Sequence, residues 1–166
     1  SDKHLTTKYL IENNVDILVT SIWEMLPHEI INATKNGTIN IHPSKLPQYR
    51  GSLPTLWSLK NSDKISAVTY IILNEKMDTG DILYQKSFII DKNDDYFSIE
   101  SKIHKIINDS LLEKIKEYEE KTTIILKQNQ SLSSKTAKYE DYKLIDLRNE
   151  ISKDIFNKVN LYNYLD

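Results

Sequence analysis

Helix-like and strand-like segments alternate between residues 5 and 90, and this alternation constrains the fold more than any other feature of the chain. Apolar residues at helical spacing predict helices over 5–13, 28–35 and 54–61. Apolar runs and alternating patterns predict strands over 16–20, 38–42, 65–73 and 82–90. Because strands that alternate with helices form a sheet with helices on its faces, we expect an α/β fold with a mostly parallel sheet.

The second half of the chain begins with a predicted long helix over 98–119. Ile99, Ile103 and Ile106 recur at intervals of three and four residues, so they form an apolar stripe that we expect to pack on the sheet. Asp95 stands where a helix N-cap is expected. A Ser-rich segment follows over 129–136, which predicts a loop or linker, and 149–160 predicts a final helix.

Composition removes several classes of function. The three glycines are too scattered for a G-x-G-x-x-G or phosphate-binding loop, and the absence of cysteine excludes disulfides and thiolate metal ligands. The four histidines show no ligand spacing, so we expect no metal. A formal net charge of -2 without a basic run is unlike a strong nucleic-acid binder. No apolar run is long enough for a membrane span, and no secretory signal is evident, so we expect a cytoplasmic protein.

Two polar residues stand near the end of the predicted strand 38–42. Residues two apart on a strand point to the same face, so Asn40 and His42 project together near the strand's C-terminal end. In an open α/β sheet, ligands bind outside that end. An amide and an imidazole side by side can both donate hydrogen bonds to one oxygen. Taken alone, the pair also fits a strand end whose polar residues cap a turn.

The segment M-D-T-G-D at 77–81 predicts a tight turn, with Gly80 free to take a positive φ. Such a turn would hold Asp78 rigidly at the mouth of a strand. A carboxylate near an imidazole favours the charged imidazolium and can accept a proton. Taken alone, an ordinary hairpin turn is the simpler interpretation.

The loop 44–51 and the residues after it supply the third group of candidates. Arg50 is suited to pairing with a phosphate or a carboxylate. Trp57 is suited to stacking on a substrate, although an aromatic residue on a short helix more often belongs to the core.

In combination, these elements resemble the folate-dependent formyltransferase family. The motif N-x-H-P-S-x-L-P-x-Y-R-G occupies 40–51, and M-D-T-G-D-I-L occupies 77–83. The resemblance implies a Rossmann-like formyltransferase fold and 10-formyltetrahydrofolate as formyl donor. It also implies a catalytic triad of Asn40, His42 and Asp78.

The resemblance further implies where the two substrates bind. Segment 17–30 looks like the family's strand and loop that line the pterin pocket, with simple core packing as the alternative. The matching cofactor-binding positions, with one from the later turn, are Trp23, Met25, Leu26, Pro27 and Met77. The matching acceptor-binding positions are Ser44, Arg50, Gly51 and Trp57.

The chain departs from the family in two places. The family begins with a further βαβαβ stretch that would complete the sheet and part of the substrate sites, and Lys45 replaces a usual apolar residue. We therefore expect a partial formyltransferase catalytic domain over 1–128, lacking the family's N-terminal strands, and a linker with a small C-terminal helical extension over 129–166. An inactive, truncated formyltransferase is the alternative.

The acceptor is expected to be a small-molecule amine. The Y-R-G element followed by Pro54 and Trp57 is shared with sugar-nucleotide formyltransferases, so we expect the primary amine of a nucleotide-linked amino sugar. The core of a methionyl-tRNA formyltransferase is the alternative. Transfer RNA is the less expected partner because the chain is acidic and the tRNA enzymes continue into a further C-terminal domain. A homodimer is one possible assembly, and we expect no membrane partner.

Overall fold

The computed structural model of this 166-residue chain describes residues 3–22 and 24–135. The helices are α1 (Lys3–Glu12), α2 (His28–Ile31), α3 (Pro54–Lys60), α4 (Tyr96–Glu119) and the 3-10 helix η1 (Gln130–Leu132). The strands are β1 (Leu18–Thr20), β2 (Thr38–His42), β3 (Ile65–Ile72) and β4 (Ile82–Ile89). The predicted α/β alternation is confirmed. The predicted final helix over 149–160 lies outside the described residues.

The four strands form one sheet in the order β1-β2-β3-β4. β1 runs parallel to β2, whereas β2 with β3 and β3 with β4 are antiparallel. The sheet is therefore mixed, and the expectation of mostly parallel strands was wrong for the described part. The connection 73–81 between β3 and β4 is a turn, and parallel neighbours need a crossover of a dozen or more residues.

The helix α2 ends four residues earlier than its pattern predicted. The backbone N–H groups of Lys35 and Asn36 donate to the carbonyls of Val15 and Asp16 instead of continuing the helix. These two hydrogen bonds tie residues 35 and 36 to the loop before β1. The chain then passes Gly37 and enters β2.

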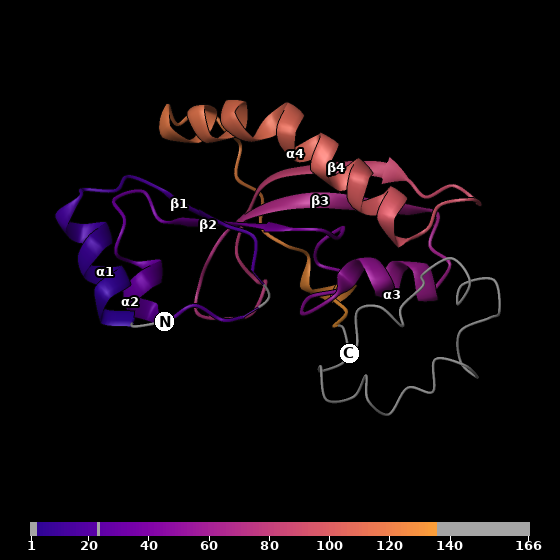
Figure 1. Ribbon diagram of the computed structural model, residues 1–166, viewed down its shortest axis with the longest axis horizontal. Coiled ribbons are helices and arrows are strands. Elements are labelled where there is room, and N and C mark those ends of the chain that lie inside the picture. Colours follow the sequence, from indigo (N-terminus) through magenta and orange to yellow (C-terminus); the bar gives the residue numbers. More distant parts are fainter. Residues whose placement is uncertain (1–2, 23, 136–166) are drawn as a thin grey trace.

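Helix α4 covers one face of the sheet. In Figure 1 it runs across β3 and β4, while α1 and α2 lie together at the other end of the sheet. Asp95 caps it in a capping box with Ser98, as expected. Ile99 and Ile103 are buried against Ile39, Ile41 and other core residues, and Ile106 is partly buried against the same cluster. The predicted amphipathic helix is confirmed.

The opposite face of β3 is covered by the loop that follows β2. Leu46 packs against Ile71 and Ile82, and Thr69 Oγ1 donates to the Ser44 carbonyl at 2.6 Å. Alternate residues of β3 thus face α4 or this loop, and seven of its eight residues are buried or half-buried. Among the described residues, no helix is long and apolar enough to cross a membrane.

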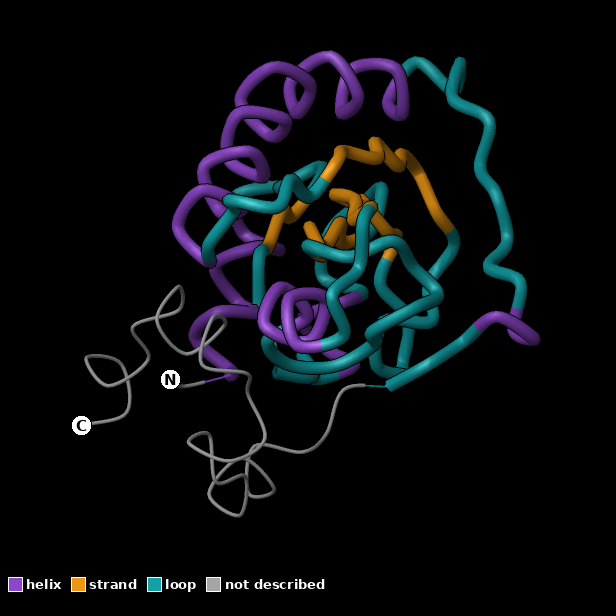
Figure 2. The backbone as a smooth tube through the Cα atoms, turned by 90° about the vertical axis from the view of Figure 1, so that its right-hand side faces the viewer, coloured by secondary structure: helices purple, strands orange, loops and turns teal. Residues whose placement is uncertain are grey.

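A returning strap, defined here as residues 126–135, closes the described part of the chain. Figure 2 shows the chain leaving α4 and descending along one side of the sheet to η1. Leu126 exchanges two backbone hydrogen bonds with Ile82, at 2.7 and 2.9 Å. Ser134 then accepts from the Arg50 amide at 3.0 Å and donates to the Pro47 carbonyl at 3.2 Å. The strap therefore touches the start of β4 and the loop after β2, next to the elements that carry the candidate catalytic residues.

Candidate active site

Asn40 lies on β2 with its side chain on the face opposite α4. The carboxamide Oδ1 accepts from Thr20 Oγ1 at 2.9 Å and from the Ile22 amide at 3.2 Å, and Nδ2 donates to the Ile22 carbonyl at 3.4 Å. These contacts fix which end of the amide carries the hydrogens. A carboxamide has two N–H donors, and the described residues supply a partner for one of them.

His42 lies two residues further along β2 and is almost fully buried. Its Nε2 lies 2.9 Å from the Tyr49 carbonyl, and since a carbonyl only accepts, Nε2 carries a hydrogen. The other ring nitrogen, Nδ1, lies 3.7 Å from Asp78 Oδ2. The Tyr49 contact therefore orients the ring so that Nδ1 faces the carboxylate.

Tyr49 is itself held in place. Its backbone has a left-handed φ of 57°, its amide donates to Ser134 Oγ, and its hydroxyl donates to Asp63 Oδ2 at 2.7 Å. Burial is the main reason that the pKa of the Tyr49 phenol is raised, and the hydrogen bond with Asp63 adds to it. The hydroxyl thus stays protonated at neutral pH and anchors the carbonyl that orients His42.

Asp78 sits in the connection between β3 and β4 and is buried. One carboxylate oxygen, Oδ2, accepts from the Gly51 amide at 2.8 Å and faces His42. The Asp78 backbone is left-handed, with φ 51°, a conformation that non-glycine residues rarely adopt. The carboxylate is thus held between the loop after β2 and the imidazole.

Gly80 has a different role from the one expected. The positive-φ glycines are Gly37 and Gly51, and the left-handed residue of the turn is Asp78 itself. A Cβ on Gly80 would lie 1.9 Å from the Ile72 carbonyl oxygen. Glycine is therefore required at position 80 because the turn passes directly against the end of β3.

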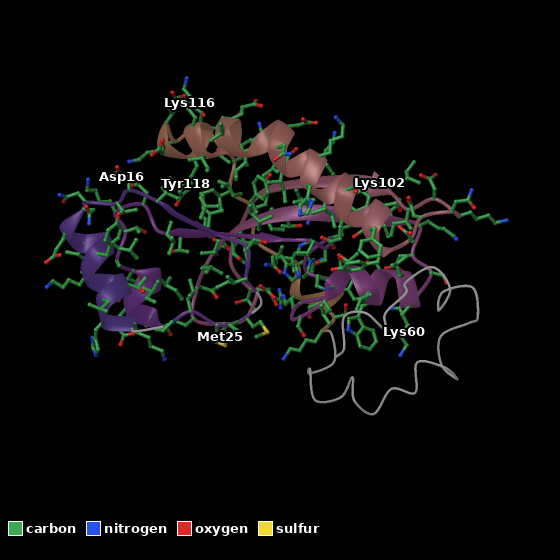
Figure 3. The ribbon with its side chains drawn as sticks, viewed as in Figure 1. Asp16, Met25, Lys60, Lys102, Lys116 and Tyr118 are labelled. Carbon is green, nitrogen blue, oxygen red and sulfur yellow. The ribbon has the colours of Figure 1, made fainter. Side chains whose placement is uncertain are left out.

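Three of the five predicted folate-binding residues line a cleft beside this group. Asn40 and Asp78 line the cleft together with Met25, Leu26 and Met77. Met25 and Met77 are exposed, and Figure 3 shows Met25 on the side of the sheet away from α4. Pro27 stands at the N-cap of α2, and Trp23 lies outside the described residues. The folate-binding roles of these residues remain predictions.

The predicted acceptor-binding residues are distributed differently. Ser44 is fully buried, with Oγ donating to the Gln48 carbonyl at 2.7 Å, and Trp57 is half-buried beneath Lys60 Nζ at 4.9 Å from the ring centre. Gly51 contacts the site directly, because its backbone amide donates a hydrogen bond to the Asp78 carboxylate.

The Arg50 guanidinium contacts the strap. Its Nε and Nη2 donate to Gln128 Oε1, and its Nη1 donates to Gln130 Oε1 at 2.9 Å. Burial lowers the pKa of the Arg50 guanidinium, and the nearby Asp78 carboxylate opposes that effect. The acceptor-binding role of Arg50 stays a prediction, because these contacts neither support it nor contradict it.

Gln128 and Tyr49 contact the candidate catalytic residues and were not identified from sequence. Gln128 lies directly before the predicted loop 129–136, where no sequence pattern indicates a role, and the use of the Tyr49 carbonyl depends on the path of the loop after β2. Among the described residues, no group of three or more His, Asp or Glu could hold a metal ion.

The profile of the formyl transferase family matches residues 2–115, and the chain belongs to this family. The methionyl-tRNA formyltransferase of Wolbachia sp. subsp. Drosophila simulans (strain wRi) is 39% identical over 130 residues. That match covers 78% of this chain and 43% of the relative, so the chain spans less than half of the relative's length.

Solved structures agree with the α/β formyltransferase fold. The formyltransferase PseJ from Anoxybacillus kamchatkensis, in complex with UDP-4,6-dideoxy-4-formamido-L-AltNAc and tetrahydrofolate, superposes with a TM-score of 0.69 at 25% identity, covering 80% of this chain and 69% of that one. Phosphoribosylglycinamide formyltransferase from Bacillus halodurans gives a TM-score of 0.58 at 26% identity, covering 63% of this chain and 54% of that one.

Proposed function

We propose that this protein transfers a formyl group from 10-formyltetrahydrofolate to a primary amine. The observation that carries the proposal is the convergence of Asn40, His42 and Asp78, with Nδ1 of the imidazole 3.7 Å from the carboxylate. The cleft beside them combines the apolar side chains of Met25 and Met77 with polar groups. That combination suits a donor with a flat ring system and a polar, reactive amide.

Asn40 and His42 serve the oxygen on which charge develops when the amine attacks the formyl carbon. Asn40 Nδ2 offers its second hydrogen, and His42 offers the hydrogen on Nδ1 when the ring is protonated. The distance of 3.7 Å to Asp78 exceeds a hydrogen bond, so Nδ1–H can still donate to a substrate oxygen. One such donor is typically worth about 3–4 kcal/mol in the transition state.

Asp78 moves the proton. Its carboxylate lies beside the imidazole and accepts, directly or through water, the proton that the attacking amine loses. The nitrogen of the donor that loses the formyl group regains one proton, so the products are a formamide and tetrahydrofolate. The Gly51 amide holds Oδ2 and leaves the other oxygen, Oδ1, for this transfer.

The comparisons bear on the acceptor in two ways. The sequence relative at 39% identity is named as a methionyl-tRNA formyltransferase, which supports the amino group of methionyl-tRNA as the acceptor. The Y-R-G motif and the likeness to PseJ at 25% identity support a nucleotide-linked amino sugar as the second candidate. Because the identity is higher, we propose methionyl-tRNA as the first acceptor to test. We expect either reaction to take place in the cytoplasm.

The test incubates the natural, full-length protein with formyl-labelled 10-formyltetrahydrofolate and each acceptor in turn. Label in methionyl-tRNA or in the amino-sugar nucleotide supports the proposal and identifies the acceptor. Binding of the folate without transfer to either acceptor contradicts the proposal and favours an inactive member of the family.

A further inference from the structure

Gln128 lies between the turn that carries Asp78 and the loop that follows β2. Its Nε2 donates to the carbonyls of Asp78 and Gly80, at 2.8 and 2.7 Å. Its Oε1 accepts from Arg50 Nε and Nη2, at 3.1 and 2.5 Å. Both donors and both acceptor positions of the carboxamide are thus used, and the side chain is 7% exposed.

We propose that Gln128 is a positioning residue for formyl transfer, which acts by holding the Asp78 turn against the loop that carries Arg50 and Gly51. The inference rests on the proposed function and extends it to a residue of the strap. Gln128 is not among the residues that line the cleft, so it acts on the reaction through the groups it holds, chiefly Asp78.

The backbone conformation of the turn explains why such a clamp is needed. A left-handed non-glycine residue such as Asp78 costs about 1–2 kcal/mol and persists only where its surroundings impose it. Asn74 ties the turn together from within, and two further contacts join the turn to the loop after β2. The Gly51 amide binds the Asp78 carboxylate, and Gln128 binds the Asp78 carbonyl while it also binds Arg50. Loss of the second contact frees the Asp78 carbonyl, while the carboxylate keeps only the Gly51 amide and the neighbouring imidazole.

The strap keeps Gln128 in register. Leu126 is paired with Ile82 by two backbone hydrogen bonds, and Gln130 adds a contact to Arg50 on the far side. Within the described part of the chain Gln130 contacts neither Asp78 nor Gly80, and it is exposed. It therefore provides a matched control, because it shares the strap and Arg50 with Gln128 but not the turn.

The chemistry of the carboxamide gives a selective variant. Gln128→Glu keeps the length and the Arg50 contact, but sets a carboxylate against the carbonyls of Asp78 and Gly80. Gln128→Met keeps a similar volume without a buried charge. It removes the hydrogen bonds to the turn and those from Arg50. Gln130→Ala removes an Arg50 contact and a long hydrogen bond to the Gln128 backbone carbonyl, at 3.4 Å, and leaves the Gln128 carboxamide in place.

The first arm of the test measures exchange of the Gly51 amide hydrogen by NMR in the natural protein, without substrates. If Gln128 holds the turn, Gly51 exchange should rise by about tenfold or more in Gln128→Glu and Gln128→Met, because opening of the turn costs less by about 1.4 kcal/mol. It should be unchanged in Gln130→Ala. Unchanged Gly51 protection in folded Gln128 variants overturns the inference, whether or not the protein is an enzyme.

The second arm measures steady-state kinetics of formyl transfer. We expect kcat to fall by about 10²-fold in both Gln128 variants with KM for each substrate nearly unchanged, since a displacement on the order of 1 Å has such an effect. Combined with Asp78→Asn, Gln128→Met should add little further loss, because it acts through that side chain. An additive loss, or a change confined to KM, contradicts the inference, whereas absence of transfer by the wild type contradicts the proposed function alone.

Discussion

Substitution of Gly80 by alanine should disturb both the fold and the site, because the turn has no room for a side chain. The added Cβ would lie 1.9 Å from the Ile72 carbonyl oxygen and 2.9 Å from its carbon. Those two atoms belong to the backbone of β3, so no rotation of a side chain relieves the overlap. The turn or the end of the strand must move by about 1 Å, and overpacking of this kind typically costs about 1–3 kcal/mol.

The same displacement should reach the reaction. Asp78 stands two residues before Gly80, and Gln128 binds both of their carbonyls, so the carboxylate is expected to shift with the turn. We expect a loss of about 10²-fold in kcat in addition to the loss of stability.

The assay is urea unfolding followed by circular dichroism, with kcat measured on the folded variant. Gly37→Ala is the control, because its added Cβ meets only Ile72 Cγ2 at 3.9 Å. Its φ of +89° should still cost about 1 kcal/mol, but kcat should not change. A Gly80→Ala variant as stable and as active as the wild type would show that the turn does not approach β3 so closely.

Two further results are expected. Arg50→Ala should lower kcat, because Gln128 loses its partner on the loop side, and a rise only in KM for the acceptor would instead support the acceptor-binding role implied by the family resemblance. Asp94→Asn should lower the free energy of unfolding at neutral pH by about 1–3 kcal/mol. Burial opposes ionisation of Asp94, but hydrogen bonds from Lys102, the Asp91 amide and Ser98 lower its pKa. The difference in urea unfolding between wild type and variant should therefore disappear as the pH falls below 3.8, the ordinary value, through the folded pKa, and a difference that persists there would refute this assignment.

Local patterns in the sequence predicted most elements of the fold. The strand Thr38–His42 and the capped helix α4 follow from alternation, helical spacing and one capping residue, all of which act over a few positions. The antiparallel pairing of β3 with β4 was missed although the connection 73–81 is too short for a parallel crossover, whereas the antiparallel pairing of β2 with β3 depends on contacts between separate segments. The helix predicted over 28–35 was too long because the amide of Lys35, its last residue, donates to the Val15 carbonyl, and the next amide, of Asn36, donates to Asp16.

For the candidate site too, the sequence predicted local placement but not the contacts between separate segments. The spacing of Asn40 and His42 placed both on one face of β2, and the structure brings Asp78 to the same side. The left-handed position of Asp78, the role of Gly80 and the contacts of Gln128 were missed. Each arises where separate segments meet in space, and Gln128 contacts Asp78 from fifty positions away in the sequence.

The most direct test of the proposed reaction compares the wild-type protein with His42→Asn in a single-turnover assay. Both are mixed with formyl-labelled 10-formyltetrahydrofolate and methionyl-tRNA, or the amino-sugar nucleotide if that acceptor is the active one, and folate affinity is measured alongside. Because His42 serves an oxygen charge that exists only in the transition state, the variant should bind the folate normally and transfer formyl about 10²–10³-fold more slowly. Formyl transfer by His42→Asn at the wild-type rate would contradict the role of this site.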